Sequence, residues 1–171
     1  TVFAFCRCGD PAPEVKQAQQ PAASENTTAK DAPFRIDRLS PQLDRLISPG
    51  TLPEQIAAGY TWAEGPCWVG DVEDGYLIWS DVPENTIYWW SETTPAQVFL
   101  RPAGFTGEHT TDFESGSNGL LLDTDGSLIL CQHGDRRIAR LRSPEPGREG
   151  MFATIADNYD GKRFNSPNDI V

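Results

Sequence analysis

The chain has 171 residues, of which 38% are hydrophobic and 23% are charged, and its formal net charge at pH 7 is −11. This composition is typical of a globular protein, and no apolar run approaches the roughly 18 residues of a membrane-spanning helix. The acidic charge argues against nucleic acid or an anionic membrane as a partner, because neither supplies the opposite charge.

The N-terminal segment, residues 1–33, is expected to lie outside the folded domain. Residues 1–8 form a short apolar stretch, interpreted as the end of a truncated signal sequence, and residues 9–33 are rich in Pro, Ala, Gln and Ser. Such a segment buries too little apolar surface to offset its ordering entropy, so it is predicted to be a disordered tether. The pattern favours export to the periplasm or the extracellular space over a cytoplasmic location.

A short helix is predicted at about residues 40–47. Apolar residues between 34 and 47 recur at steps of three and four, which is typical of one helix face. Ser40 is a good N-cap and Pro41 suits the first helical position. Pro49 and Gly50 end the helix.

From residue 52 onward the pattern is that of β-strands. Runs of four to eight apolar, β-branched or aromatic residues are bounded by Gly, Asp, Asn and Pro. Residues 34–171 are therefore predicted to form an all-β domain preceded by the short helix. The strands are placed near residues 53–58, 65–70, 75–80, 85–90, 96–101, 117–122, 127–132, 136–142, 151–157 and 168–171.

Two cysteines fall inside these predicted strands. Cys67 and Cys131 are interpreted as small side chains of the core. A disulfide between them is the alternative, which an oxidising compartment would favour.

Two groups of predicted strands repeat at one constant spacing. Residues 75–80 are matched by residues 126–131, and residues 87–90 are matched by residues 138–141. Strand-built repeats of about 50 residues predict a β-propeller. A propeller closes with about 4–8 blades. The chain reaches Val171 within a third repeat, so we expect it to hold about two to three blades of a longer protein.

Each repeat begins with an oxygen-bearing side chain at the same place. These side chains are Glu64, Asn118 and Asn168. The first strand of each propeller blade lines the central channel, so the three side chains are expected to converge on one axis. Converging carboxylate and amide oxygens are the ligands that a hard cation needs.

Four motifs carry a resemblance to a known family: Glu64-Gly65-Pro66-x-Trp68, Ser80-Asp81-x-Pro83-x-Asn85, Cys131-Gln132-His133-Gly134 and Arg163-Phe164-Asn165-Ser166-Pro167-Asn168-Asp169. In this order, they resemble the gluconolactonase branch of the senescence-marker-protein/gluconolactonase/luciferin-regenerating-enzyme family. The resemblance covers about residues 36–171. It implies a six-bladed β-propeller that holds one divalent cation on its axis.

The resemblance also implies the metal ligands. They are Glu64 and Asn168, while the remaining ligands and the general-base Asp are expected beyond Val171, so the chain alone is expected to be inactive. Calcium is the expected ion, with magnesium or zinc as alternatives. Oxygen ligands favour calcium or magnesium over zinc.

Three residues are candidates for binding the substrate. Asn118 is interpreted as a substrate contact or a support for one, with a turn residue before Gly119 as the alternative. His133 lies in a short connection between two strands and is a natural hydrogen-bonding group near pH 7. Arg163 lies near Asn168 and is expected to hydrogen-bond sugar hydroxyls.

The function implied for the intact protein is metal-dependent hydrolysis of a sugar lactone. Two alternatives stay open. One is a phosphotriesterase-like hydrolase on the same scaffold. The other is a non-catalytic propeller that binds calcium or a protein partner.

Overall fold

The computed structural model describes residues 34–71, 73–108, 114–141 and 152–171. The predicted signal sequence and tether, residues 1–33, lie outside the described residues. Within the described part, no helix is long and apolar enough to cross a membrane.

A short helix precedes the sheets, as the sequence predicts. It is the 3₁₀-helix η1, Pro41–Arg45, and the hydroxyl of its N-cap Ser40 accepts a hydrogen bond from the Gln42 N–H at 3.3 Å. It is shorter than predicted and of the 3₁₀ type. None of its residues is buried, so no tertiary packing extends it beyond the short runs that 3₁₀ geometry favours.

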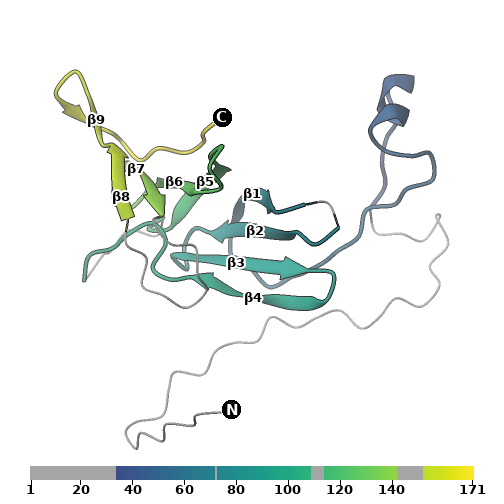
Figure 1. Ribbon diagram of the computed structural model, residues 1–171, viewed down its shortest axis with the longest axis horizontal. Helices are drawn as coiled ribbons and strands as arrows, with labels where there is room; N and C mark the ends of the chain where they lie inside the picture. Colours follow the sequence, from purple (N-terminus) through teal and green to yellow (C-terminus); the bar gives the residue numbers. More distant parts are fainter. Residues whose placement is uncertain (1–33, 72, 109–113, 142–151) are drawn as a thin grey trace, which may run out of the picture.

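Two four-stranded antiparallel sheets make up most of the described chain (Figure 1). In each sheet the strands lie in chain order. The first sheet contains β1 (Ala63–Val69), β2 (Tyr76–Asp81), β3 (Thr86–Ser91) and β4 (Thr94–Leu100). The second contains β5 (Ser117–Leu122), β6 (Leu128–Gln132), β7 (Arg137–Leu141) and β8 (Phe152–Ala156), and the hairpin β9 (Asn158–Tyr159) and β10 (Lys162–Arg163) follows.

The all-β prediction is confirmed, but two predicted strands are wrong. Residues 53–58 and 168–171 are not strands. A strand needs a hydrogen-bonded neighbour. Residues 168–171 are held beside β5 by one backbone bond, from the Gly119 N–H to the Asn168 carbonyl at 2.7 Å. The β9–β10 hairpin was not predicted, because such short strands carry no alternating pattern.

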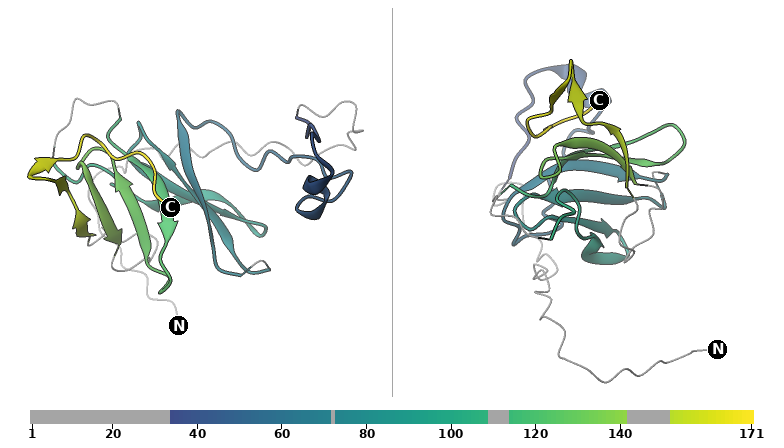
Figure 2. Two further views of the ribbon diagram at one scale, coloured as in Figure 1. Left: turned by 90° about the horizontal axis from the view of Figure 1, so that it is seen from above. Right: turned by 90° about the vertical axis from the view of Figure 1, so that its left-hand side faces the viewer.

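One apolar core joins the two sheets, which pack against each other (Figure 2). Strands β1 and β2 of the first sheet both contact β5 of the second. Burying a large aliphatic side chain stabilises a fold by about 1.5–3 kcal/mol. The buried core residues are Ile78, Ile87, Phe99, Leu100, Ala103, Leu120, Leu128, Leu130 and Leu141. Cys131 is also buried and Cys67 is half-buried, and both thiols are free, so the disulfide alternative is wrong.

The sequence repeat is visible in the backbone as well as in the side chains. Asn85 and Arg136 occupy equivalent positions in the β2–β3 and β6–β7 turns, and both have positive φ, of 52° and 58°. Each side chain also holds the segment that leaves its sheet. The side-chain Oδ1 of Asn85 accepts the N–H groups of residues 103–105, while the Arg136 guanidinium donates to the Phe164 carbonyl at 2.6 Å. The two sheets are therefore copies of one structural unit.

Candidate functional site

The predicted site residues gather at one end of the two sheets. Strand register pairs Ala63 with Asp81 and Ser117 with Gln132. The starts of β1 and β5 therefore lie beside the ends of β2 and β6. Glu64, Asn118 and His133 occupy this common end.

The first strand of each sheet, β1 or β5, is irregular at its candidate residue or directly after it. The register of β1 shifts between Glu64 and Cys67, and that of β5 shifts between Ser117 and Leu120. Such bulges re-aim side chains and are frequent beside functional sites. Both repeats therefore depart from regular pairing beside their candidate residue, Glu64 or Asn118.

Glycines bring the three repeated segments into direct backbone contact. A Cβ on Gly65 would lie 2.3 Å from the Asn118 carbonyl oxygen, and a Cβ on Gly119 would lie 2.7 Å from Oδ1 of Asp169. The sequence therefore needs glycine after both Glu64 and Asn118. The order across this end is β1, then β5, then residues 168–169.

The two predicted metal ligands flank Asn118 in this order. Glu64 is half-buried, and its Oε1 accepts a hydrogen bond from Nε1 of Trp62 at 2.7 Å. Asn168 is exposed, and its backbone carbonyl accepts the N–H of Gly119. In the described ranges, no group of three or more His, Cys, Asp or Glu residues forms a metal site. A cation here would need amide and carboxylate oxygens from separate segments.

Asn118 is the most firmly held of the candidate residues. It is 3% exposed, and its backbone carbonyl accepts the Ser80 hydroxyl at 3.0 Å. The Ser117 hydroxyl lies 2.8 Å from that of Ser80, and both serines are fully buried. The backbone of Asn118 is thus fixed from one side by Ser80 and from the other by Gly65.

The side chain of Asn118 continues into a chain of polar contacts. Its Nδ2 lies 2.9 Å from Nδ1 of His133, and Nε2 of His133 lies 3.2 Å from Oε2 of Glu114. Sequence reasoning identified Asn118 and His133 separately but missed Glu114. Glu114 lies in a long connection, where no short-range pattern indicates its partner.

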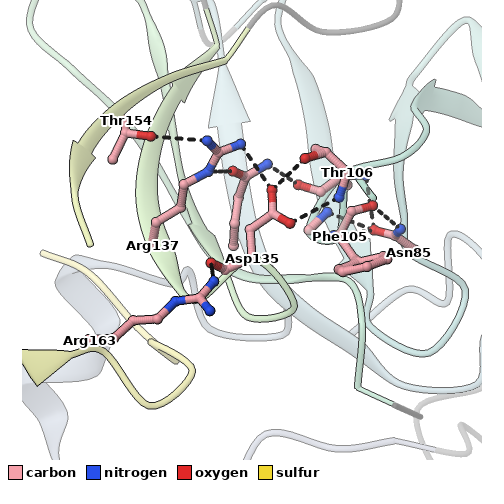
Figure 3. Close-up of polar contacts among 10 residues, drawn as sticks. Asn85, Phe105, Thr106, Asp135, Arg137, Thr154 and Arg163 are labelled. Carbon is pink, nitrogen blue, oxygen red and sulfur yellow. Dashed lines mark hydrogen bonds and ion pairs between the residues drawn. The ribbon is translucent and has the colours of Figure 1, made fainter. Parts of the chain in front are cut away.

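The turn that carries His133 also organises the surrounding loops through Asp135 (Figure 3). The Asp135 carboxylate accepts hydrogen bonds from the Thr106 N–H at 3.1 Å and the Thr106 hydroxyl at 2.7 Å, and pairs with Arg137 at 3.0 Å. Arg137 also donates to Gln132 and Thr154. Sequence reasoning missed Asp135, which resembles any other acidic turn residue.

Arg163 reaches the same turn from the β9–β10 hairpin. Its guanidinium donates to the Asp135 carbonyl at 2.8 Å, and the residue is exposed. This contact uses one of the five N–H donors of an arginine. Binding of substrate hydroxyls by Arg163 stays a prediction.

Burial shifts the pKa of two groups near the ends of β2 and β6. Burial raises the pKa of the Cys131 thiol to about 11, and the Asp169 carboxylate adds to this rise. Burial, followed by Tyr88 and Asp81, raises the pKa of Tyr60 to about 12. Both groups are therefore neutral near pH 7, and neither is a nucleophile activated by a lowered pKa.

Comparison with known proteins adds three relatives. A gluconolactonase from Zymomonas mobilis subsp. mobilis is 33% identical over 153 residues, which cover 86% of this chain and 40% of that protein. An X-ray structure of a gluconolactonase candidate has 36% sequence identity and a TM-score of 0.53, covering 69% of this chain and 35% of the other. A gluconolactonase from Xanthomonas campestris has 32% identity and a TM-score of 0.49, covering 64% of this chain and 31% of the other.

The chain thus spans about two fifths of the length of the Zymomonas relative. The family model of the SMP-30/Gluconolactonase/LRE-like region matches residues 62–171 of the sequence. These residues include both sheets and all the predicted site residues. The resemblance stated from the four motifs is confirmed. The chain belongs to the SMP-30/Gluconolactonase/LRE-like family.

Proposed function

We propose that the intact protein carrying these residues hydrolyses a sugar lactone and that a divalent cation, most suitably calcium, assists the reaction. The observation that carries the proposal is the 33% identity to a gluconolactonase over 153 residues. The activity is proposed for the intact protein, because the chain spans 40% of that relative.

The proposed scaffold is a β-propeller of about six blades, of which the two sheets are successive members. Three observations support this proposal: the sequence repeat, the chain order of strands in both sheets, and the contact between the first strands β1 and β5. In such a ring the first strands face the channel, where a cation and a small substrate would meet.

The proposed cation ligands are the Glu64 carboxylate and the Asn168 side-chain oxygen. The chemistry of these donors fits calcium or magnesium, which bind carboxylate and amide oxygens. A glutamate also has two oxygens, so the bond from Trp62 to Oε1 of Glu64 leaves Oε2 for a metal. When bound, the cation would polarise the lactone carbonyl as a Lewis acid.

The remaining residues of this end are proposed to bind and orient the sugar. Asn118 is held by its backbone and by His133, so its amide meets a substrate with little further loss of conformational freedom. Arg163 carries further N–H donors beyond the one that binds Asp135. These groups suit the hydroxyls of a polyhydroxylated lactone.

The proposal is tested by lactone hydrolysis with the purified intact protein. We expect turnover of glucono-δ-lactone that is lost in EDTA and restored by added Ca²⁺. Turnover that persists after complete metal removal would contradict the metal dependence. Calcium binding without lactone turnover would favour the non-catalytic alternative, and faster turnover of phosphotriesters than of lactones would favour the phosphotriesterase alternative.

A further inference from the structure

The contacts among Glu114, His133 and Asn118 determine which way the Asn118 amide faces. Nε2 of His133 lies 3.2 Å from a carboxylate oxygen of Glu114. An ionised carboxylate only accepts hydrogen bonds, so the imidazole proton belongs on Nε2. Nδ1 of the neutral ring is then an acceptor.

This protonation state assigns the roles of the Asn118 atoms. Nδ2 of Asn118 lies 2.9 Å from Nδ1 of His133 and donates to it. The opposite orientation of the amide would place Oδ1 against the Nδ1 lone pair, so that two acceptors would face each other. With Nδ2 facing the ring, as it does here, a doubly protonated imidazole would bring two N–H donors together. The neutral ring with its proton on Nε2 satisfies both contacts.

The orientation of the amide matters because the rest of Asn118 is immobile. The residue is 3% exposed, and its carbonyl is bound by the Ser80 hydroxyl and packed against Gly65. Rotation of the amide about its last side-chain bond is the freedom that remains. His133 removes this freedom and leaves Oδ1 as the atom that Asn118 offers to a ligand.

Among the described residues no hydrogen bond uses Oδ1 of Asn118. An amide oxygen presented to a ligand selects groups that donate a hydrogen bond. Asn118 lies between the β1 segment that carries Glu64 and residues 168–169, at the end of the sheets proposed to bind the lactone. A site built to hydrogen-bond a hydroxyl strongly discriminates against analogues that lack it, since its own polar atom is then left without a partner.

We propose that Glu114 and His133 are positioning residues that present the Asn118 carbonyl oxygen to a hydroxyl of the lactone, and thereby set a preference for polyhydroxylated lactones. This inference rests on the proposed lactone hydrolysis. Glu114 acts only through His133, and His133 acts only through the amide of Asn118.

The first arm of the test is spectroscopic and does not depend on turnover. Histidine-selective ¹⁵N NMR of the intact protein is recorded at about pH 8, above the ordinary titration range of histidine. The signal of His133 is assigned by its loss in the His133→Asn variant. We expect the tautomer that is protonated on Nε2. Protonation on Nδ1 would overturn the inference whether or not the protein hydrolyses lactones.

The second arm compares glucono-δ-lactone with unsubstituted δ-valerolactone. His133→Leu removes the acceptor for Asn118 and should raise KM for glucono-δ-lactone about tenfold more than it raises KM for δ-valerolactone, with a smaller effect on kcat than on KM. His133→Asn keeps an oxygen near the position of Nδ1, so its KM for glucono-δ-lactone should stay close to the wild-type value. Likewise, Glu114→Gln should raise KM for glucono-δ-lactone less than Glu114→Leu does, because Gln retains an acceptor for the Nε2 proton.

The two arms separate the possible failures. Equal losses for both lactones in His133→Leu and His133→Asn would show a purely structural role and overturn the inference. Absence of turnover of either lactone by the wild-type protein would overturn the proposed function and the specificity role together. The NMR result would still decide the tautomer.

Discussion

Gly65 lies directly against the backbone of Asn118, so that a Cβ at Gly65 would come within 2.3 Å of the Asn118 carbonyl oxygen. The contact joins the first strand of one sheet to the first strand of the next. It also places the residue after Glu64 in contact with the central residue of the candidate site. Glycine is required here both by this approach and by a φ of 55°, since only glycine adopts positive φ without steric cost.

Replacing Gly65 by alanine should therefore destabilise the fold strongly. The Cβ meets backbone atoms of β5 that cannot rotate away, and alanine is strained at positive φ, so we expect a loss of about 3 kcal/mol in the free energy of unfolding. Urea unfolding measures the change. Gly126→Ala is the matched control, because Gly126 has a φ of 80° with nothing within 4 Å. A loss no larger than in that control would contradict the steric account.

Asp135→Ala should loosen the loop that passes the candidate site. The variant removes an acceptor for the N–H and hydroxyl of Thr106 and a partner of Arg137, at a carboxylate whose side chain is 14% exposed. We expect the free energy of unfolding to fall by about 2 kcal/mol and hydrogen exchange at the Thr106 amide to become faster. Asp37→Ala removes an exposed pair with Arg35 and should change stability by less than about 0.5 kcal/mol. Unchanged exchange at Thr106 would be evidence against the role assigned to Asp135.

The stability of the fold should fall at alkaline pH in a manner that depends on Cys131. Burial raises the pKa of this thiol from 9.0 to about 11, so the folded state holds the proton more tightly than the unfolded state. The resulting stabilisation is fully present below about pH 9 and is lost as the pH rises toward about 11, by up to about 2 kcal/mol. Urea unfolding of the wild type and of Cys131→Ala over this pH range measures the loss of stability.

The comparison of these two proteins isolates the thiol. The cavity left by Cys131→Ala costs the same free energy at every pH, and the tyrosines titrate in both proteins. The wild type should therefore lose more stability than the variant across this alkaline range. Parallel pH profiles would rule out the assigned contribution of Cys131.

Glu64→Gln should weaken calcium binding by the intact protein. Glutamine keeps an oxygen for the Trp62 indole N–H but removes the negative charge, so the affinity should fall by at least about tenfold. Isothermal titration calorimetry with Ca²⁺ measures the dissociation constant. Glu84→Gln removes an exposed charge in the β2–β3 turn and should leave the affinity unchanged. Equal affinities for wild type and Glu64→Gln would eliminate Glu64 as a ligand.

Local sequence patterns were sufficient to predict most of the strands and the helix cap. The alternation and turn residues of β2 and β3 recur in β6 and β7, and Ser40 caps η1 as expected. The failures occurred where local pattern is insufficient. Residues 53–58 contain Pro, Glu and Ala, which are depleted in strands, and do not form the predicted strand. The β9–β10 hairpin forms from strands too short to show a period.

The residues of the candidate site also fall into two groups, those that the sequence predicted and those that only the structure showed. Glu64, Asn118 and Asn168 are recognisable because each occupies the same position of a repeat, and a repeat is a property of sequence alone. Glu114 and Asp135 are not recognisable, since their importance comes from His133 in one case and from Thr106 and Arg137 in the other.

The motifs of the sequence identified the family by resemblance. The all-β class and the repeated positions that carry polar oxygens followed from residue type and spacing alone. The tertiary structure alone decided which polar groups meet. The bond between Ser80 and Asn118 joins residues 38 positions apart, and it exists because β1 and β2 pack on β5. Hydrogen bonds act over about 3 Å, so partners distant in sequence are identified only after the sheets have brought them together.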